Sequence, residues 1–502
     1  MLASIKSLLY VLAIAAIVFQ FAKPIALRFS TAEDFKRRRN VWLALTITAF
    51  LSPNFWIFVL VAVPLLRWAV NRDSTPIALY LLLLHVIPSI PIRIPIIGIN
   101  NLFELDIYRL LAFVVLVPTA SRLRDSTHGR IARLQAGDWL LLAYGVLQTV
   151  LFVPAVLPNH VLVRNSFTSE MRRAALFLLD AYLVYWVTSR SCSDRRSITD
   201  AMAAFCLACV LMASLAIFES VRHWLLYVEL ASRWSGDAIA GFYLMRGDVL
   251  RAQVSAGHAL ALGYLLAVAF GFWLYLRSHV SSRKQQLAVS LILCLGLMAA
   301  YSRGPWLGAL VIYLTFSVAG PRGLSRLAKA ATTAAASIAM VFVSPLGERV
   351  TRVLPFLGGS VDSGSVDYRS RIVEESWKLI RERPLFGDQL ALFKLEVLRQ
   401  GEGIIDLVNT YVDVALFYGL IGLACFLGPV LIGLLKTYEC TRTERKHNSD
   451  FALLGTALVS CILGTLVMIS SCSFILGYEK MYYVLAGLAA AYVHACQSRE
   501  SS

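Results

Sequence analysis

The sequence predicts an all-α polytopic membrane protein, and three features support this fold class: the composition, the apolar runs and the placement of the charges. Hydrophobic residues make up 58% of the 502 residues and charged residues 16%, and the mean hydropathy is +0.67. Soluble globular proteins are less apolar than this. From the helix-sized apolar runs we expect about 12–14 transmembrane helices.

The apolar runs extend along the whole chain and are mostly separated by short links. One long polar interval, from Gly347 to Leu407, interrupts them. A single membrane domain is therefore expected, with N-terminal transmembrane helices (1–346), a large loop (347–407) and C-terminal transmembrane helices (408–502). The apolar runs lie at about 4–22, 40–51, 54–70, 76–93, 105–120, 138–157, 174–189, 199–220, 256–276, 287–302, 305–319, 327–345, 408–435, 451–473 and 480–497.

The charges predict the orientation of these helices. The net charge is +16, and the Lys and Arg residues cluster in short links between apolar runs, such as Lys36–Arg39 and Lys436–Lys446. Placing all basic links in the cytoplasm gives a consistent alternation of spans, with the large loop on the opposite, outer face. The charge is thus a signal of topology and not of nucleic-acid binding. The nine cysteines show no metal-ligand spacing, so neither a metal site nor a disulfide is expected.

The large loop is expected to contain one amphipathic helix. In the segment Tyr368–Phe386, the apolar residues Val373, Trp377 and Ile380 recur at helical spacing, and Pro384 lies where the pattern stops. We expect this helix to lie flat on the membrane surface, with Trp377 on the apolar side. The alternative is an ordinary solvated loop with one surface helix.

Several arginines are predicted at the outer ends of the helices. Arg303 lies in the sequence YSRGPW, where Gly304 permits close approach and Pro305 begins the next helix. Arg251 precedes the run that begins at Ala256, and Arg371 lies in the large loop. Guanidinium groups that converge at one cleft are suited to a phosphate or diphosphate. The alternative is that these side chains extend to lipid headgroups.

Four stretches together resemble the O-antigen ligase and polysaccharide polymerase family of bacterial inner-membrane proteins. The similarity covers residues from about 250 to about 435, in the same order as in the family. The stretches are RAQVSAGHALALG (Arg251–Gly263), AYSRGPWLGALV (Ala300–Val311), the segment from Arg371 through Trp377 to PLFG, and VNTYVDVALFYGLIG (Val408–Gly422).

The resemblance implies glycan transfer from an undecaprenyl-diphosphate carrier on the periplasmic side of the bacterial inner membrane. Family arginines hold the carrier diphosphate, and by position these would be Arg303 and Arg251, with Arg371 as a candidate in the loop. No metal, nucleotide sugar or other cofactor is implied. The expected partners are the lipid-linked glycan, membrane lipids and, in addition, a chain-length regulator and a flippase.

One position departs from the family pattern. Family ligases carry a His-Asn pair at the end of the large loop, followed by GxxG. Here the spacing from Asn409 to Gly419 and Gly422 is kept, but Val408 occupies the histidine position. A valine cannot accept a proton from an acceptor hydroxyl. This difference favours a polymerase of glycan repeat units over a ligase.

A general base would then come from another residue. Asp406 lies two residues before Val408, and Asp388 directly follows PLFG. Either carboxylate is a candidate base, and for each the alternative is a solvated loop residue.

Four further residues are candidates for accessory roles. Asp413 lies one turn inside a predicted span, where an unpaired carboxylate is costly, so we expect it to face a cleft or a cation. Asn409 belongs to the family-like stretch. His258 is a candidate for a role at the site, and the alternative is a packed structural histidine. Trp306 is also a candidate, and the alternative is an aromatic residue at the membrane interface.

Three functions therefore compete. The favoured one is polymerisation of lipid-linked repeat units for an exopolysaccharide, a capsule or O-antigen. The first alternative is an O-antigen ligase that transfers glycan to the lipid A core. The second alternative is a lipid-linked oligosaccharide flippase or other transporter, for which the arginines would line a central path.

Overall fold

The computed structural model describes residues 2–94, 102–126, 134–152, 167–235, 243–246, 249–319, 363–399, 405–474 and 477–500. The predicted run at 327–345 and the first part of the large loop, up to residue 362, lie outside the described residues. The described chain is almost entirely helical, which confirms the predicted fold class.

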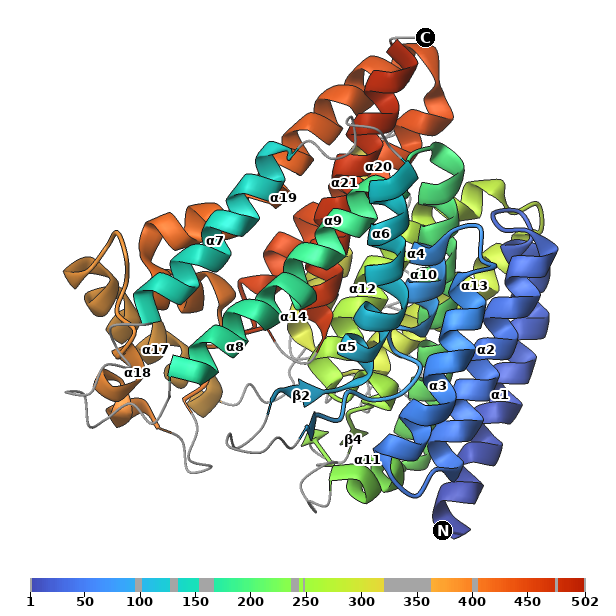
Figure 1. Ribbon diagram of the computed structural model, residues 1–502, viewed down its shortest axis with the longest axis horizontal. Helices are drawn as coiled ribbons and strands as arrows, with labels where there is room; N and C mark the ends of the chain where they lie inside the picture. Colours follow the sequence, from blue (N-terminus) through green and yellow to red (C-terminus); the bar gives the residue numbers. More distant parts are fainter. Residues whose placement is uncertain are drawn as a thin grey trace, which may run out of the picture.

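The first part of the helical bundle contains nine α-helices within the described residues, many of them long and roughly side by side (Figure 1). They are α1 (Leu2–Ala26), α2 (Ala32–Leu51), α3 (Phe55–Val70), α4 (Pro76–Leu83), α5 (Ile107–Leu111), α6 (Val117–Ser126), α7 (Ala136–Phe152), α8 (Phe167–Phe177) and α9 (Leu183–Ser191). The π-helical turns η1 (Ala112–Leu116) and η3 (Leu178–Tyr182) join α5 to α6 and α8 to α9.

The second part contains the central helices of the bundle and the helices of the large loop. They are α10 (Arg195–Arg222), α11 (Val228–Ser235), α12 (Ala259–Leu276), α13 (Arg283–Ala299), α14 (Arg303–Ala319), α17 (Ser363–Glu382), α18 (Ala391–Lys394), α19 (Thr410–His447), α20 (Ser449–Ile469) and α21 (Tyr478–Glu500). The described 3-10 turns are η4 (Val254–Ala256), η5 (Arg277–His279) and η7 (Glu396–Leu398).

Two short antiparallel strand pairs lie in loops at one end of the bundle. Strand β1 (Ile92–Arg93) pairs with β2 (Glu104–Leu105), with Ile92 opposite Leu105. Strand β3 (Met245–Arg246) pairs with β4 (Val249–Leu250), with Met245 opposite Leu250. The second pair directly precedes the segment that leads into α12.

Five helical segments within the described residues are long and apolar enough to cross a membrane. The segments are Ser4–Ala26, Arg195–Arg222, Ala259–His279, Thr410–His447 and Ser449–Ile469. These spans confirm a polytopic membrane protein. The expected total of about 12–14 spans stays a prediction.

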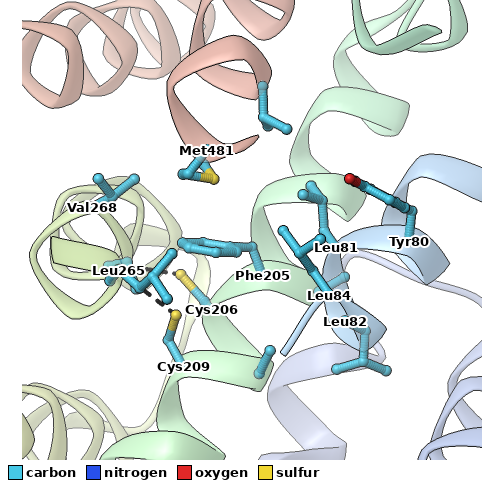
Figure 2. Packing of buried hydrophobic residues seen from close by; sticks show 14 of the residues in the cluster. Tyr80, Leu81, Leu82, Leu84, Phe205, Cys206, Cys209, Leu265, Val268 and Met481 are labelled. Atoms are coloured by element: carbon cyan, nitrogen blue, oxygen red, sulfur yellow. Dashed lines mark hydrogen bonds between the residues drawn. The ribbon is translucent and has the colours of Figure 1, made fainter. Parts of the chain in front are cut away.

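The interior of the bundle is formed where α4, α10, α12 and α21 meet (Figure 2). Small side chains on α10 allow this close packing, and two of them are cysteines. The Sγ atoms of Cys206 and Cys209 lie 3.3 Å and 3.7 Å from the carbonyl oxygens of Ala269 and Leu265. All nine cysteines are free, and these two act as small buried residues.

A buried ion-pair cluster joins α2 to α10. The Arg38 guanidinium donates to the Asp73 carboxylate at 2.7 and 2.9 Å and to the Asp200 carboxylate at 2.7 and 2.9 Å. Buried charges are tolerated only when they are paired in this way. Arg38, one of the basic residues used to predict topology, therefore also holds the fold together.

The large loop has a small apolar core of its own, which packs on the first turns of α19. Its buried residues include Ile372 and Ile380 of α17. The predicted helix is present, but its apolar residues divide between two faces. Ile380 packs inside with Ile372, whereas Val373 and Trp377 are 45% and 51% exposed. One side of α17 therefore packs in the loop core against α19, and the expected contact of Trp377 with the membrane surface stays a prediction.

Candidate functional site

Four segments that are distant in sequence meet at one end of the bundle. They are the segment that precedes α12, the turn that begins α14, the chain that enters α19 and the chain that leaves α20. The last two are joined at Thr410, whose amide and hydroxyl both donate to the Cys472 carbonyl, at 3.1 and 2.7 Å. We call this the site end of the bundle.

Arg251 joins the first of these segments to the second. Its Nη2 atom donates to the Ser302 hydroxyl at 2.8 Å, and the Ala252 amide donates to the Ala299 carbonyl at 3.0 Å. Ser302 is 2% exposed. The hydrogen bond holds the Arg251 guanidinium beside the residue that precedes Arg303.

Arg303 is the first residue of α14, and its side chain is half-buried. Its Nε atom is buried and has no hydrogen-bond partner among the described residues. The adjacent Gly304 lies against Ser471, whose hydroxyl would have to move to admit a Cβ atom, in keeping with the close approach expected at this glycine. A buried guanidinium N–H without a partner is costly, and a bound anion would satisfy it. Arg303 is therefore placed to bind an anionic group.

Asp406 lies on the chain that enters α19. Its Oδ1 atom accepts from the Val408 amide at 3.1 Å and from the Ser473 hydroxyl at 3.2 Å. Its own amide donates to the Tyr368 hydroxyl of α17 at 3.2 Å. These contacts fix the carboxylate in place and leave Oδ2 without a hydrogen bond among the described residues. The carboxylate is thus oriented for proton transfer at that atom.

His258 is the residue that caps the N-terminus of α12. Its Nδ1 atom accepts from the Leu260 amide at 3.2 Å. Burial lowers the pKa of the imidazole to about 4, the Arg251 guanidinium lowers it further and the Asp406 carboxylate opposes this. His258 is therefore neutral near pH 7, and it lies within electrostatic range of both residues.

Backbone strain gathers in the same segments. Four non-glycine residues of the described chain have a positive φ, and three of them are Val254 (49°), Tyr301 (47°) and Val408 (50°). Each belongs to one of the segments that meet at the site end. A β-branched residue in this region is strained, and such strain persists where the surrounding structure enforces it, often at functional sites.

The comparison with protein families agrees with this location. Residues 288–427 match the model of a family described as O-antigen ligase. These residues, which we call the O-antigen ligase region, are therefore similar to that family. A comparison with curated proteins found no match for the chain.

The O-antigen ligase region contains two of the segments that meet at the site end. It includes Arg303 and Asp406 but begins after Arg251 and His258. The structure therefore adds residues to the site that lie outside the matched region. Arg251 is the clearest case, because it hydrogen-bonds to Ser302 within that region.

Within the O-antigen ligase region, Asp388 is held by neighbouring residues of the large loop. It is 4% exposed, its Oδ2 atom lies 2.6 Å from Lys394 Nζ and its Oδ1 atom accepts from the Leu390 amide at 3.0 Å. Burial tends to raise the pKa of this carboxyl, but the hydrogen bond from Lys394 and the other favourable contacts outweigh it, so the pKa is lowered. A carboxylate held by a lysine in this way is a poor base. We therefore retain Asp406 and not Asp388.

The loop arginines of the O-antigen ligase region also differ from one another. Arg371 is exposed on α17, whereas Arg369 acts electrostatically on Cys472. Burial raises the pKa of Cys472 to about 11, with Asp406 adding to this and Arg369 opposing it. Arg369 is therefore the loop arginine nearer the site.

The remaining predicted residues lie at the first turns of α14 and α19. Asn409 caps α19, and its Oδ1 atom accepts from the Tyr411 and Val412 amides at 2.9 and 3.3 Å. Trp306 donates from Nε1 to the Leu297 carbonyl at 2.9 Å. Asp413 lies in the first turn of α19, within electrostatic range of Asp406. Asn409 and Trp306 thus have structural contacts that explain their presence.

Sequence reasoning missed Glu219 at the end of α10. Its carboxylate accepts from the Leu226 amide at 2.8 Å, the Gln253 amide at 3.0 Å and the Val254 amide at 2.9 Å. It is 1% exposed. A carboxylate at the end of a long apolar run is a signal that could have identified it. Glu219 positions the segment that carries Arg251 and His258.

A separate cavity of about 860 Å³ lies at the opposite end of α10, α12 and α20. Its lining includes Arg28, Arg195, Tyr275 and His279. Arg195 begins α10 and His279 follows α12, whereas Glu219 and His258 lie at the other ends of those helices. The cavity is therefore remote from the family residues and is not the candidate active site. Within the described residues, no group of His, Cys, Asp and Glu side chains is placed to hold a metal ion.

Proposed function

We propose that the protein polymerises undecaprenyl-diphosphate-linked oligosaccharide repeat units at the periplasmic face of the bacterial inner membrane. The O-antigen ligase family match supports glycosyl transfer. The observation that carries the proposal is the buried Nε–H of Arg303, which has no hydrogen-bond partner among the described residues. Arg251 hydrogen-bonds to the preceding residue, Ser302, and two guanidinium groups at one end of a helical bundle suit a diphosphate.

The reaction assigns a role to each group. An acceptor hydroxyl oxygen attacks the anomeric carbon of the donor sugar, and its proton passes to Asp406 Oδ2. The bond between the anomeric carbon and the phosphate oxygen breaks, and the electron pair leaves with the lipid diphosphate. Arg251 and Arg303 stabilise the charge that develops on that leaving group. The step uses only groups of this chain and the two lipid-linked substrates.

The strongest alternative is an O-antigen ligase, which the description of the matched family favours. Donor binding and the leaving group would be the same, and only the acceptor would differ. Val408 supports the polymerase, because the family histidine that would serve a ligase is replaced by a residue that cannot carry a proton. A transporter is less well supported, because Arg251 hydrogen-bonds to Ser302, the residue before Arg303, so both arginines lie at one end of the bundle and are not spaced along a path.

The test uses purified protein in lipid nanodiscs with undecaprenyl-diphosphate-linked repeat units as the donor. Longer lipid-linked chains would support the polymerase. Glycan moved onto an added lipid A core would instead identify a ligase. Movement of the donor across a vesicle membrane without new glycosidic bonds would contradict both and identify a transporter. The Asp406→Asn variant serves as the control for chemistry, because its contacts to Val408 and Ser473 can be retained.

A further inference from the structure

The role of His258 is determined by the nitrogen atom that caps α12. The Leu260 amide donates to Nδ1 at 3.2 Å, so Nδ1 supplies the lone pair and carries no proton. A neutral imidazole carries its single proton on the other nitrogen. His258 therefore presents Nε2–H, a hydrogen-bond donor, and not a basic lone pair.

The surroundings of the imidazole support a donor role at the diphosphate. The charged groups that act on it are the Arg251 guanidinium and the Asp406 carboxylate, both of which have roles in the proposed reaction. Nε2 has no hydrogen-bond partner among the described residues, and it is not fully buried. It is thus open to a ligand. A neutral donor is suited to a site that already contains cations, because it adds a hydrogen bond without adding charge repulsion.

We propose that His258 is a catalytic residue that donates a hydrogen bond from Nε2–H to the diphosphate oxygen of the lipid carrier as that oxygen gains charge. This inference rests on the proposed function and extends it. The imidazole keeps its proton throughout, so no acid or base has to be regenerated at this residue. The proton of the acceptor hydroxyl still passes to Asp406.

Two substitutions separate donation from capping. In Asn the side-chain oxygen takes the place of Nδ1, so His258→Asn keeps the helix cap but does not reach the Nε2 position. In Gln the amide nitrogen takes the place of Nε2, so His258→Gln keeps the donor and weakens the cap. Both variants are compared with the wild-type protein for the rate of glycan transfer and for the midpoint of thermal unfolding in detergent.

We expect His258→Asn to unfold at the wild-type temperature and to lose at least about 100-fold in rate, as the removal of one donor to a developing negative charge does. His258→Gln should retain a rate within about 10-fold of wild type. Equal losses of transfer rate in the two variants would overturn the proposal and indicate that His258 acts as a base. A loss of rate in His258→Gln alone would overturn it and indicate that His258 acts only as a helix cap. Wild-type rates in both variants would exclude a catalytic role.

A binding measurement separates failure of this inference from failure of the proposed function. Undecaprenyl diphosphate without sugar is titrated into the wild-type protein and both variants, and affinity is measured by native mass spectrometry. If the wild-type protein transfers no glycan to any acceptor, the proposed function is wrong. The donor role of His258 would then still require weaker binding by His258→Asn than by His258→Gln, and equal affinities would overturn it.

Discussion

Gly387 of the large loop and Gly419 of α19 lie directly against each other, and both have a positive φ. A Cβ atom on Gly387 would lie 2.7 Å from the Gly419 amide nitrogen, and one on Gly419 would clash with the Leu385 carbonyl. The helix is broken at Gly419, with φ 66° and ψ −170°. The PLFG segment satisfies the freed groups, because the Leu420 amide donates to the Pro384 carbonyl at 2.8 Å and the Asp388 amide donates to the Leu416 carbonyl at 2.7 Å. Irregular backbone in a membrane helix needs such partners.

Gly419→Ala is expected to separate the large loop from α19. The new methyl group meets backbone and not a movable side chain, and alanine is unfavourable at this φ, so we expect a loss of stability of at least about 1–3 kcal/mol. Thermal unfolding in detergent and protease sensitivity of the loop measure it. Gly428→Ala is the matched control, because its methyl group would meet only the end of the Leu140 side chain. Equal effects of the two substitutions would contradict the close packing described above.

Asp406→Asn and Asp388→Asn should affect different properties. In the first, the oxygen that contacts Val408 and Ser473 is kept but the proton acceptor is lost, so we expect the rate to fall by about 10²–10⁴-fold with unchanged stability. In the second, the half-exposed Lys394 loses its ion-pair partner, which costs up to about 1 kcal/mol and little activity. Initial rates with lipid-linked repeat units and unfolding midpoints distinguish these results. Comparable mild losses in rate would exclude both carboxylates as the base.

Arg303→Ala is expected to abolish chain growth while the protein still inserts in the membrane. The reason is the loss of a guanidinium whose buried Nε–H has no hydrogen-bond partner within the described part of the chain. The length of the lipid-linked glycan and the amount of membrane-inserted protein are measured together. Arg371→Ala is the control, because Arg371 is exposed on α17. Normal glycan length in the Arg303 variant would contradict its role in holding the diphosphate.

Glu219→Ala should disorder the segment that carries Arg251 and His258. The substitution leaves the amides of Leu226, Gln253 and Val254 without their acceptor, and all three residues are buried. Each unsatisfied amide costs about 1–3 kcal/mol. We expect a lower unfolding midpoint and weaker binding of undecaprenyl diphosphate. Glu219→Gln keeps one acceptor oxygen and should give intermediate values. A stable, fully active Glu219→Ala protein would show that this carboxylate does not position the segment.

His258 predicts a specific dependence of stability on pH. The folded protein lowers the pKa of the imidazole from 6.5 to about 4, mainly through burial. Between these values the unfolded chain binds a proton that the folded protein does not, so stability falls as the pH is lowered from about 6.5 to about 4. Above this range the residue has no effect of this kind. Unfolding midpoints at several pH values should show a smaller fall for His258→Asn than for the wild-type protein. Identical curves would indicate that the imidazole is not buried as described.

The helix in the large loop illustrates what a pattern can predict. The spacing of Val373, Trp377 and Ile380 predicted a helix, and α17 is present. The pattern did not predict which side would be buried, because its apolar stripe is wide. Packing on α19 buries Ile372 and Ile380 and leaves Trp377 exposed. The position of a partner helix that follows a long loop is not encoded in local periodicity.

The two candidate carboxylates show the same limit. Asp406 and Asp388 were equivalent in the sequence, as exposed acidic residues of one loop. In the structure Asp388 pairs with Lys394 of the same loop. Asp406 instead accepts a hydrogen bond from Ser473, which follows α20 in the chain. Partners that are brought together by folding decide whether a carboxylate is a structural charge or a free base.

The sequence by itself determined that this is a helical membrane protein, that it resembles the O-antigen ligase family and that Arg303 is a residue of interest, because hydropathy and local motifs are properties of short stretches. The tertiary structure decided that the segments of Arg251, His258, Arg303 and Asp406 meet at one end of the bundle, that Glu219 binds the segment that carries two of these residues and that Asp388 pairs with Lys394. Arg251 and Asp406 are 155 positions apart in the sequence, and only the packing of α10, α12, α14, α19 and α20 brings their segments together.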